Sequence, residues 1–185
     1  MAEPKHKPAT YRDVLDAPEH MVAEVVEGDL YLSPRPGKPH GHAEIRLGGL
    51  LDGSFGMGRG GPGGWVIFAE PELHLESDIL VSDLGGWRKE RAPLEGDEAY
   101  FKVVPDWVCE IVSPGTGRLD RVKKLPRYAT NGVKHAWIID PPQKSLEVYR
   151  NENGRWSIIA THAGEEVVRA EPFEAVPLEL ALLWI

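Results

Sequence analysis

Asp83 and Glu110 are two acids whose sequence surroundings could support metal-assisted chemistry. Asp83 lies near the end of the strand-like run DILVSDL (78–84), and Glu110 lies in the mostly apolar run WVCEIV (107–112). Because side chains alternate between the two faces of a strand, each acid shares a face with apolar residues. A buried carboxylate is costly unless it is paired or bound to a metal. If these strands are neighbours, the two acids could hold Mg²⁺ or Mn²⁺ through carboxylate oxygens.

Lys124 lies on the segment that follows, RLDRVKKLPRYATNG (118–132), whose pattern predicts a helix with a kink or a later start at Pro126. Asp120, Lys124 and Tyr128 are spaced four residues apart and should form one polar stripe. An adjacent apolar stripe, which we expect to face the sheet, contains Val122, Leu125 and Ala129. At the border between the stripes, Lys124 could reach the acids and stabilise charge on a phosphate in a transition state.

The remaining elements predict a mixed α/β (α+β) fold with a central mixed sheet flanked by helices. Short helices are expected at 10–18 and 40–52, and a hairpin at 23–34 with its turn at residues 27–29. Further strands are expected at 65–69, 72–76, 135–140, 146–150 and 156–161, and a covering helix or strand at 176–184. The runs at 107–112 and 135–140, with the helix between them, suggest a βαβ crossover. We expect one domain over residues 1–185.

Inward-facing acids also have a simpler explanation. Ordinary salt bridges, or an edge strand whose inner face is wet, would account for Asp83 and Glu110 without any metal. Geometry alone leaves both interpretations open.

A longer motif resembles a known family. The run PDWVCEIVSPGTGRLDRVKKLPRYATNGVKHAWIIDP (105–141) is similar to the signature of the Uma-two family, a large bacterial group of predicted restriction endonucleases in the PD-(D/E)XK superfamily. Weaker similarity extends to AEVVEGDLYLSPRP (23–36), to the segment from His40 into RLGGLL, and to ILVSDLGGWR (79–88). The resemblance implies a restriction-endonuclease-like core and DNA as the substrate.

The resemblance also implies roles for individual residues. Asp83 matches the first metal-binding acid and Glu110 the second, while Lys124 matches a catalytic lysine that has moved onto the helix. Tyr128 matches the usual neighbour of that lysine. The positions of Glu24 and His40 match recurrent positions on the active-site side, and we expect them to support the site.

Two positions depart from the general superfamily motif. Ser82 stands where a proline is usual, which matters little because proline ligates nothing. Val112 stands where the E-x-K lysine would be, and without Lys124 this would suggest an inactive enzyme.

The net charge of −8 counts against a tight, general DNA binder, since such proteins carry basic stripes. Only two local clusters are basic, one at residues 88–91 and one at residues 118–127. The single cysteine, the lack of a long apolar run and an N-terminus without an apolar signal core predict a cytoplasmic protein that does not enter a membrane. A homodimer is possible, since double-strand cutters often pair two sites.

Weaker signals have simpler explanations. Zinc binding by His40, His42 and His74 is not expected, because no cysteine lies nearby to complete the site. The glycine-rich stretch GMGRGGPGG (56–64) lacks the ending of a phosphate-binding loop and predicts a flexible turn. Cys109 alternates with Glu110 and should face away from the site. Most tryptophans should pack in the core (Trp65, Trp107 and Trp137), whereas Trp87 beside Arg88 is the best surface candidate.

Three functions follow from these patterns. The leading hypothesis is a Mg²⁺- or Mn²⁺-dependent DNA endonuclease that uses Asp83, Glu110 and Lys124. The alternative is a catalytically inactive nuclease-fold protein that binds DNA or a protein partner and keeps the acids for structure. The third is a hydrolase of small phosphoesters.

Overall fold

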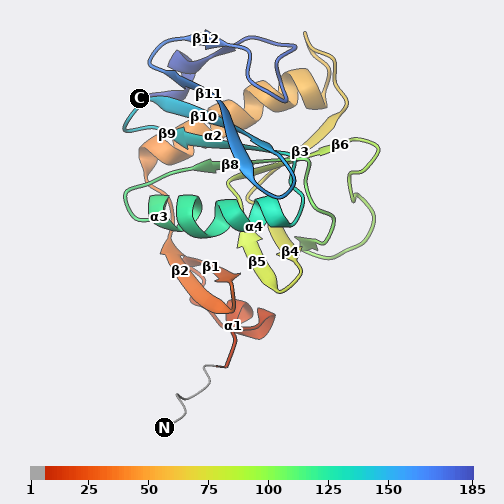
Figure 1. Cartoon of the computed structure of the whole chain (residues 1–185), viewed down its shortest axis with the longest axis vertical. Coiled ribbons are helices and arrows are strands. Elements are labelled where there is room, and N and C mark those ends of the chain that lie inside the picture. Colours follow the sequence, from red (N-terminus) through yellow and green to blue (C-terminus); the bar gives the residue numbers. More distant parts are fainter. Residues whose placement is uncertain (1–6) are drawn as a thin grey trace.

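The computed structural model describes residues 7–185, which form two β-sheets with helices packed against them (Figure 1). Residues 1–6, part of the N-terminal stretch inspected for a signal sequence, lie outside the described residues. The five-stranded sheet has the order β2-β1-β5-β4-β7, and the six-stranded sheet has the order β11-β10-β9-β8-β6-β3. The predicted mixed α/β fold with a central mixed sheet is therefore confirmed.

The bounds of the elements follow the chain. The five-stranded sheet contains β1 (Met21–Val26), β2 (Asp29–Pro34), β4 (Glu72–Leu75), β5 (Asp78–Val81) and β7 (Tyr100–Phe101). The six-stranded sheet contains β3 (Trp65–Ala69), β6 (Leu84–Arg88), β8 (Trp107–Ile111), β9 (His135–Asp140), β10 (Ser145–Asn151) and β11 (Trp156–Ala163). A short ladder joins β12 (Val167–Val168) to β13 (Leu178–Glu179). The helical elements are α1 (Tyr11–Leu15), α2 (Lys38–Leu51), η1 (Asp52–Gly56), α3 (Gly117–Leu119), η2 (Asp120–Lys124), α4 (Leu125–Thr130) and η3 (Leu180–Leu183).

The predicted hairpin and crossover both form. β1 and β2 pair antiparallel around Glu27 and Gly28, whose φ angles of 54° and 85° lie in the left-handed region that a two-residue hairpin turn requires. β8 and β9 pair in parallel, with α3, η2 and α4 as the connection between them. This parallel pair makes the six-stranded sheet mixed.

The six-stranded sheet separates two hydrophobic cores. On one face, alternate β8 residues Trp107, Cys109 and Ile111 pack with α2 and with the C-terminal segment, so the predicted cover at 176–184 is confirmed as β13 and η3. On the other face, Val108 packs with Tyr128 of α4 and with the five-stranded sheet. Period-2 geometry puts Glu110 on the Val108 face, between the two sheets.

One predicted strand is wrong. The run 78–84 is not a single strand, because β5 ends at Val81 in one sheet and β6 begins at Leu84 in the other. The chain therefore crosses between the sheets at Ser82 and Asp83. The glycines that follow allow close packing: a Cβ on Gly85 would lie 2.8 Å from the Pro71 ring, and one on Gly86 3.1 Å from Trp107.

The segment 118–132 has the irregularity predicted at Pro126, since α4 begins only at Leu125, but its faces differ from the prediction. A π-helical turn, η2, lies directly before Pro126, whose ring nitrogen has no hydrogen to donate to the preceding turn. Asp120, Lys124 and Tyr128 are all buried, whereas Val122 is 57% exposed. The polar stripe therefore faces inward, because its members find partners there, and the prediction that Val122 faces the sheet is wrong.

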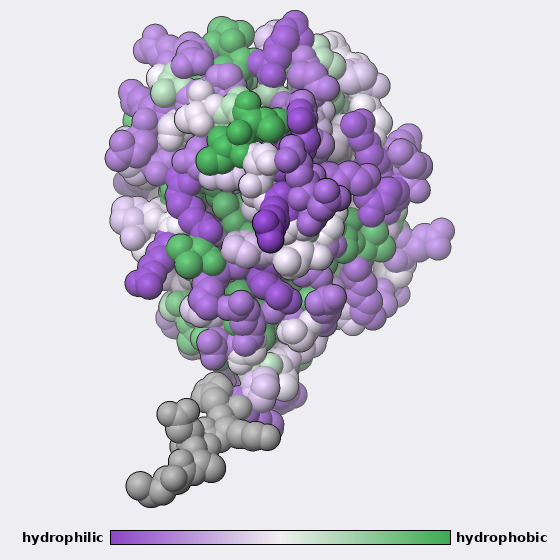
Figure 2. All heavy atoms as spheres, viewed as in Figure 1, coloured by the Kyte–Doolittle hydropathy of each residue, from purple (hydrophilic) through white to green (hydrophobic). Residues whose placement is uncertain are grey.

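The outer surface offers few apolar patches on the face in view. In Figure 2 most of this face is hydrophilic, and hydrophobic residues gather only in small separate groups. Among the described residues, no helix combines the length and apolarity needed to cross a membrane.

Candidate active site

A cavity of about 260 Å³ brings together residues from both sheets and from η2. Five of the six residues singled out from the sequence line it: Glu24, His40, Asp83, Glu110 and Lys124. The sixth, Tyr128, lies behind Glu110 and contacts it directly. Two further segments line it, residues 33–37 at the end of β2 and beyond it, and residues 113–116 after β8.

Asp83 and Glu110 are neighbours because β6 and β8 pair antiparallel. Leu84 lies opposite Cys109, so continuing the register by one residue places Asp83 opposite Glu110. The Asp83 carboxylate accepts a hydrogen bond from the backbone N–H of Ile111 at 2.5 Å. The expectation that the two acids meet across neighbouring strands is met by this geometry, although Asp83 lies at the sheet crossing rather than within a strand.

Lys124 is surrounded by oxygen atoms. Its ammonium lies 2.9 Å from Glu24 Oε1 and 3.0 Å from Glu110 Oε1, and it donates a hydrogen bond to the Val81 carbonyl at 2.7 Å. Asp120, one turn earlier, is 3.6 Å away. Burial alone lowers the pKa of Lys124, but the negative charges of Glu110 and Glu24 outweigh burial and raise that pKa well above its usual value.

One ammonium cannot neutralise three buried carboxylates. Burial raises the pKa of Glu110 well above its usual value, against the opposing effect of Lys124, and raises the pKa of Asp120 to about 6. The Tyr128 hydroxyl donates a hydrogen bond of 2.6 Å to Glu110 Oε1. Burial and the nearby charge of Glu110 raise the pKa of Tyr128, which keeps this donor protonated. The cluster therefore has more acidic groups than its single ammonium can neutralise, and the raised pKa values of Glu110 and Asp120 favour their protonated forms.

His40 and Glu44 approach Asp83 from α2. Residues 40, 43, 47 and 51 of α2 are buried, so this helix presents His40 and Glu44, one turn apart, toward the sheet crossing. His40 Nε2 lies 3.0 Å from Asp83 Oδ1 and 3.9 Å from Glu44 Oε2. Burial lowers the pKa of His40, but Asp83 outweighs burial and raises it. Burial, followed by the charges of Asp83 and Glu70, raises the pKa of Glu44 to about 7.

Glu24 has two partners at the cavity. Besides its ion pair with Lys124, its Oε1 accepts a hydrogen bond of 2.8 Å from the Val81 N–H. Through Glu24, the β1–β2 hairpin is thereby linked both to the end of β5 and to η2, which carries Lys124. That Glu24 supports the site stays a prediction.

Sequence reasoning missed Asp120 and Glu70, which line the cavity, and Glu44, which lies beside it against His40. Asp120 was seen as part of the polar stripe but not as a site residue, and Glu44 and Glu70 were not considered. Asp120 and Glu44 each lie one helical turn from a residue that was singled out, Asp120 before Lys124 and Glu44 after His40. The spacing of four residues is the signal that would have found Asp120 and Glu44.

The predictions for tryptophan and cysteine have different outcomes. Trp87 is fully buried, packs against Phe68 and Phe101, and donates a hydrogen bond to the Val103 carbonyl at 2.9 Å, so the prediction of a surface contact is wrong. Its place in β6 decides this, because that strand is covered on both faces. Cys109 is confirmed as buried on the face away from Glu110. Three tryptophans are confirmed in the core: Trp65, Trp107 and Trp137.

The two basic clusters are largely occupied by partners. Arg121 pairs with Glu147, Lys123 with Glu27, and Arg127 with Asp78. In the other cluster Arg91 pairs with Asp106, and Arg88 lies over the Trp65 ring at 4.2 Å. Arg88 is at the far end of β6 from Asp83, about 16 Å away along the strand.

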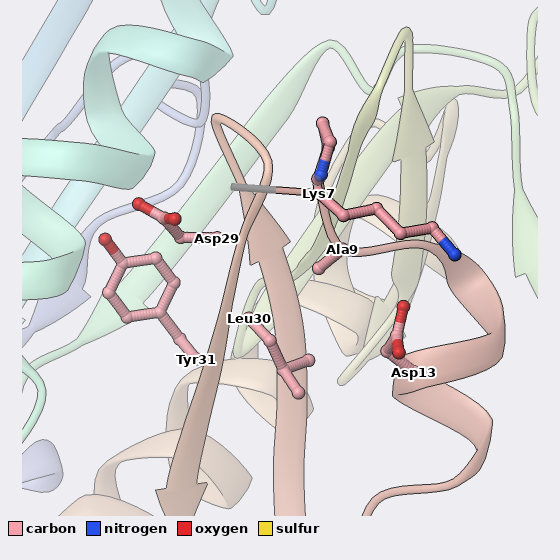
Figure 3. A pocket seen from close by; sticks show the side chains of 7 residues that line it. Lys7, Ala9, Asp13, Asp29, Leu30 and Tyr31 are labelled. Carbon is pink, nitrogen blue, oxygen red and sulfur yellow. The ribbon is translucent and has the colours of Figure 1, made fainter. Parts of the chain in front are cut away.

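A second, larger cavity of about 560 Å³ lies elsewhere, between the N-terminal segment and β2. Figure 3 shows its lining side chains, among them Lys7, Asp13, Asp29 and Tyr31. None of the singled-out residues lines it, whereas Asp83 and Glu110 both line the smaller cavity.

Comparisons with known proteins agree with this class of fold. The family model of Uma2, described as "Putative restriction endonuclease", matches residues 8–182, so the chain belongs to the Uma2 family, which is the Uma-two family of the sequence motif. A crystal structure from Anabaena variabilis, titled as that of "a putative nuclease belonging to DUF820", is similar with a TM-score of 0.77 and 22% identity, covering 95% of this chain and 97% of that chain. At this identity the likeness shows the fold. No curated protein matches this chain.

Proposed function

We propose that this chain is a divalent-metal-dependent DNA endonuclease, in which Asp83 and Glu110 hold Mg²⁺ or Mn²⁺ and Lys124 assists. The observation that carries this proposal is the contact between the Asp83 carboxylate and the N–H of Ile111, which places Asp83 beside Glu110 with Lys124 3.0 Å from Glu110. Membership of the Uma2 family supports the reaction class.

The donor set fits a small, hard cation. Mg²⁺ is commonly bound by one or two carboxylates, with waters and phosphate oxygens completing its shell. Within residues 7–185, no group of three His, Cys, Asp or Glu residues is arranged to hold a metal by itself. Two adjoining carboxylates therefore suit Mg²⁺ or Mn²⁺ better than zinc, which needs a closer protein cage. His74 stacks on Tyr100 with ring centroids 3.8 Å apart and does not line the cavity with His40.

Each protein group then has a defined task. Asp83 and Glu110 would hold Mg²⁺, which when bound would supply an activated water and polarise the phosphodiester. Lys124 presents a positive charge at the cavity floor, where it stabilises charge that develops on the phosphate. The Ile111 N–H and His40 orient Asp83, and Tyr128 orients Glu110.

The direct test uses supercoiled plasmid with Mg²⁺ or Mn²⁺. Wild type should nick the plasmid, whereas Asp83→Asn and Lys124→Gln should lose about 10²-fold or more of the rate. Circular dichroism of each variant shows whether it is folded. Equal nicking by all three proteins would indicate a contaminating nuclease and remove the assignment.

A non-cleaving role is the second candidate. This candidate is suggested by the ion pairs of Lys124 with Glu24 and Glu110. The same ion pairs would also serve as a purely structural bridge in a protein that binds DNA or a protein partner. Calorimetric titration with Mn²⁺ separates the two functions. Binding that is present in wild type and lost in Glu110→Gln would contradict a structural role alone.

A further inference from the structure

We infer that the preferred substrate of this site is a flexible single strand of DNA rather than an intact duplex. This inference rests on the proposed nuclease function and names the substrate class of the same cavity. Four features of the described residues support it: the depth of the carboxylates, the segments around them, the charge of the lining and the position of the basic residues.

The groups that would act on a phosphodiester lie at the bottom of the cavity. Glu110, Glu24 and Lys124 are each 3% exposed or less. Asp83 is the most open of the proposed metal-binding acids, with a side chain 20% exposed. A scissile phosphate must therefore enter the cavity, since these groups cannot reach out to a phosphate on the molecular surface.

Two of the segments that line the cavity contain proline. Residues 33–37, at the end of β2 and beyond it, include Pro34 and Pro36, and residues 113–116 include Pro114. Proline fixes its own φ angle, which limits the backbone freedom of these walls at three positions. The cavity volume of about 260 Å³ lies just below the usual range for a ligand site, so it has room for one nucleotide unit at most. A base-paired strand would first have to unpair and unstack the nucleotide that enters, which costs free energy that a single strand does not spend.

The charge of the lining also disfavours a duplex. Five acids line the cavity, and the fixed cations among its lining residues are Arg35 and Lys124. Lys124 is already engaged at the floor, which leaves Arg35, 63% exposed and 4.0 Å from Glu70, as the rim cation for a flanking phosphate. Arg88 and Arg91, from the basic cluster at residues 88–91, lie at the other end of β6 with partners of their own. One metal-bound phosphate and one neighbour can be compensated here, whereas two strands of phosphates cannot.

The test compares one labelled oligonucleotide in three forms: as a single strand, as a full duplex, and as a duplex with a central unpaired bubble. Cleavage with Mn²⁺ should show kcat/KM about tenfold or more higher for the single strand than for the duplex, with the bubble close to the single strand. Arg35→Ala should raise KM for the single strand severalfold with kcat unchanged. The matched control is Arg12→Ala, which removes an exposed arginine of α1 that pairs only locally with Asp16, and it should leave KM unchanged.

The outcomes separate the two proposals. Equal or faster cleavage of the duplex, abolished in Asp83→Asn, would overturn the single-strand inference and leave the nuclease function standing. An unchanged KM for Arg35→Ala would contradict the proposed contact between Arg35 and a flanking phosphate of the entering strand. Cleavage of none of the three DNAs would contradict the nuclease function and the inference together.

Discussion

The Lys124 ammonium and the Glu24 carboxylate lie 2.9 Å apart, and both side chains are 4% exposed. The pair joins the N-terminal hairpin to the helix between β8 and β9. Glu24 also accepts a hydrogen bond from the Val81 N–H, so its carboxylate binds the end of β5 as well as the Lys124 ammonium.

Replacement of Glu24 by Gln should therefore lower stability. The amide oxygen can still accept the Val81 N–H, but Lys124 loses one of its counter-charges, and we expect a loss of about 1–3 kcal/mol in the free energy of unfolding. Urea unfolding measures this loss. Glu27→Gln is the matched control, because it removes an exposed carboxylate that pairs with Lys123, and its effect should stay within about 0.5 kcal/mol. A Glu24→Gln protein as stable as wild type would contradict a structural role for this pair.

Lys124→Met should destabilise the fold more strongly and in a pH-dependent way. Without the ammonium, the buried Glu110 and Asp120 face each other uncompensated, and we expect a loss of about 3–5 kcal/mol at neutral pH. Because burial already raises the pKa of both carboxyls, their protonation in the folded state relieves the repulsion at low pH. The difference from wild type should therefore shrink from pH 8 to pH 5, as measured by urea unfolding in chelator. If the difference in unfolding free energy between Lys124→Met and wild type stayed constant from pH 8 to pH 5, Glu110 and Asp120 would not change their protonation in this range.

Glu44→Gln should stabilise the protein at alkaline pH. The folded pKa of Glu44, about 7, lies above its ordinary value of 4.5, so the folded state binds this proton more tightly than the unfolded state. Stability from this group is present below about pH 4.5 and falls as the pH rises toward 7. Removing the charge should gain roughly 2 kcal/mol at pH 8 and almost nothing at pH 4. Glu165→Gln is the control, because Glu165 is exposed. If the free energy of unfolding of Glu44→Gln ran parallel to that of wild type from pH 4 to pH 8, this would contradict the raised pKa of Glu44.

Tyr128→Phe should lower the stability of the protein and its kcat without changing the shape of the cavity. The hydroxyl donates its hydrogen bond to Glu110 Oε1 in a fully buried position, and its loss should cost about 1.5–3 kcal/mol of stability. The proposed function adds a severalfold loss of kcat, because Glu110 is then less well oriented. Tyr149→Phe, which removes a similar hydroxyl from Glu147 outside the cavity, should leave kcat unchanged. Equal kcat values for wild type and Tyr128→Phe would restrict Tyr128 to a structural role.

The sequence was informative where local pattern and fold coincide. The β8–helix–β9 unit could be predicted because its strands are apolar and its connection carries a helical period, and the same unit holds Glu110, Lys124 and Tyr128. The β1–β2 hairpin was also predictable, since Gly28 supplies the positive φ angle of its turn. These features depend on contacts between residues that are close together in the sequence, or on the backbone conformation of a single residue.

Long-range features were harder to predict. The change of sheet at Ser82 and Asp83 is hard to see in the run 78–84, because no glycine or proline separates Val81 from Leu84. Burial of Trp87 depends on Phe68 and Phe101, which come from other strands. The inward turn of Lys124 depends on three acids from different elements, and only Asp120 shares its helix. A pattern along one segment cannot reveal which distant segment covers it.

Binding of Mn²⁺ gives the most direct check of the proposed metal site. A cation held by Asp83 and Glu110 stabilises the folded state by mass action, by about 2.7 kcal/mol when its free concentration is a hundredfold above Kd. Differential scanning calorimetry should show Tm rising with Mn²⁺ concentration in wild type. Asp83→Asn and Glu110→Gln should remove the rise, because each takes away one of only two protein carboxylates proposed for the ion. Asp106→Asn is the control, since this buried acid pairs with Arg91 and Lys134 outside the cavity, and it should keep the rise even with a lower starting Tm. A Tm that rises equally in wild type, Asp83→Asn and Glu110→Gln would place the ion elsewhere on this acidic chain.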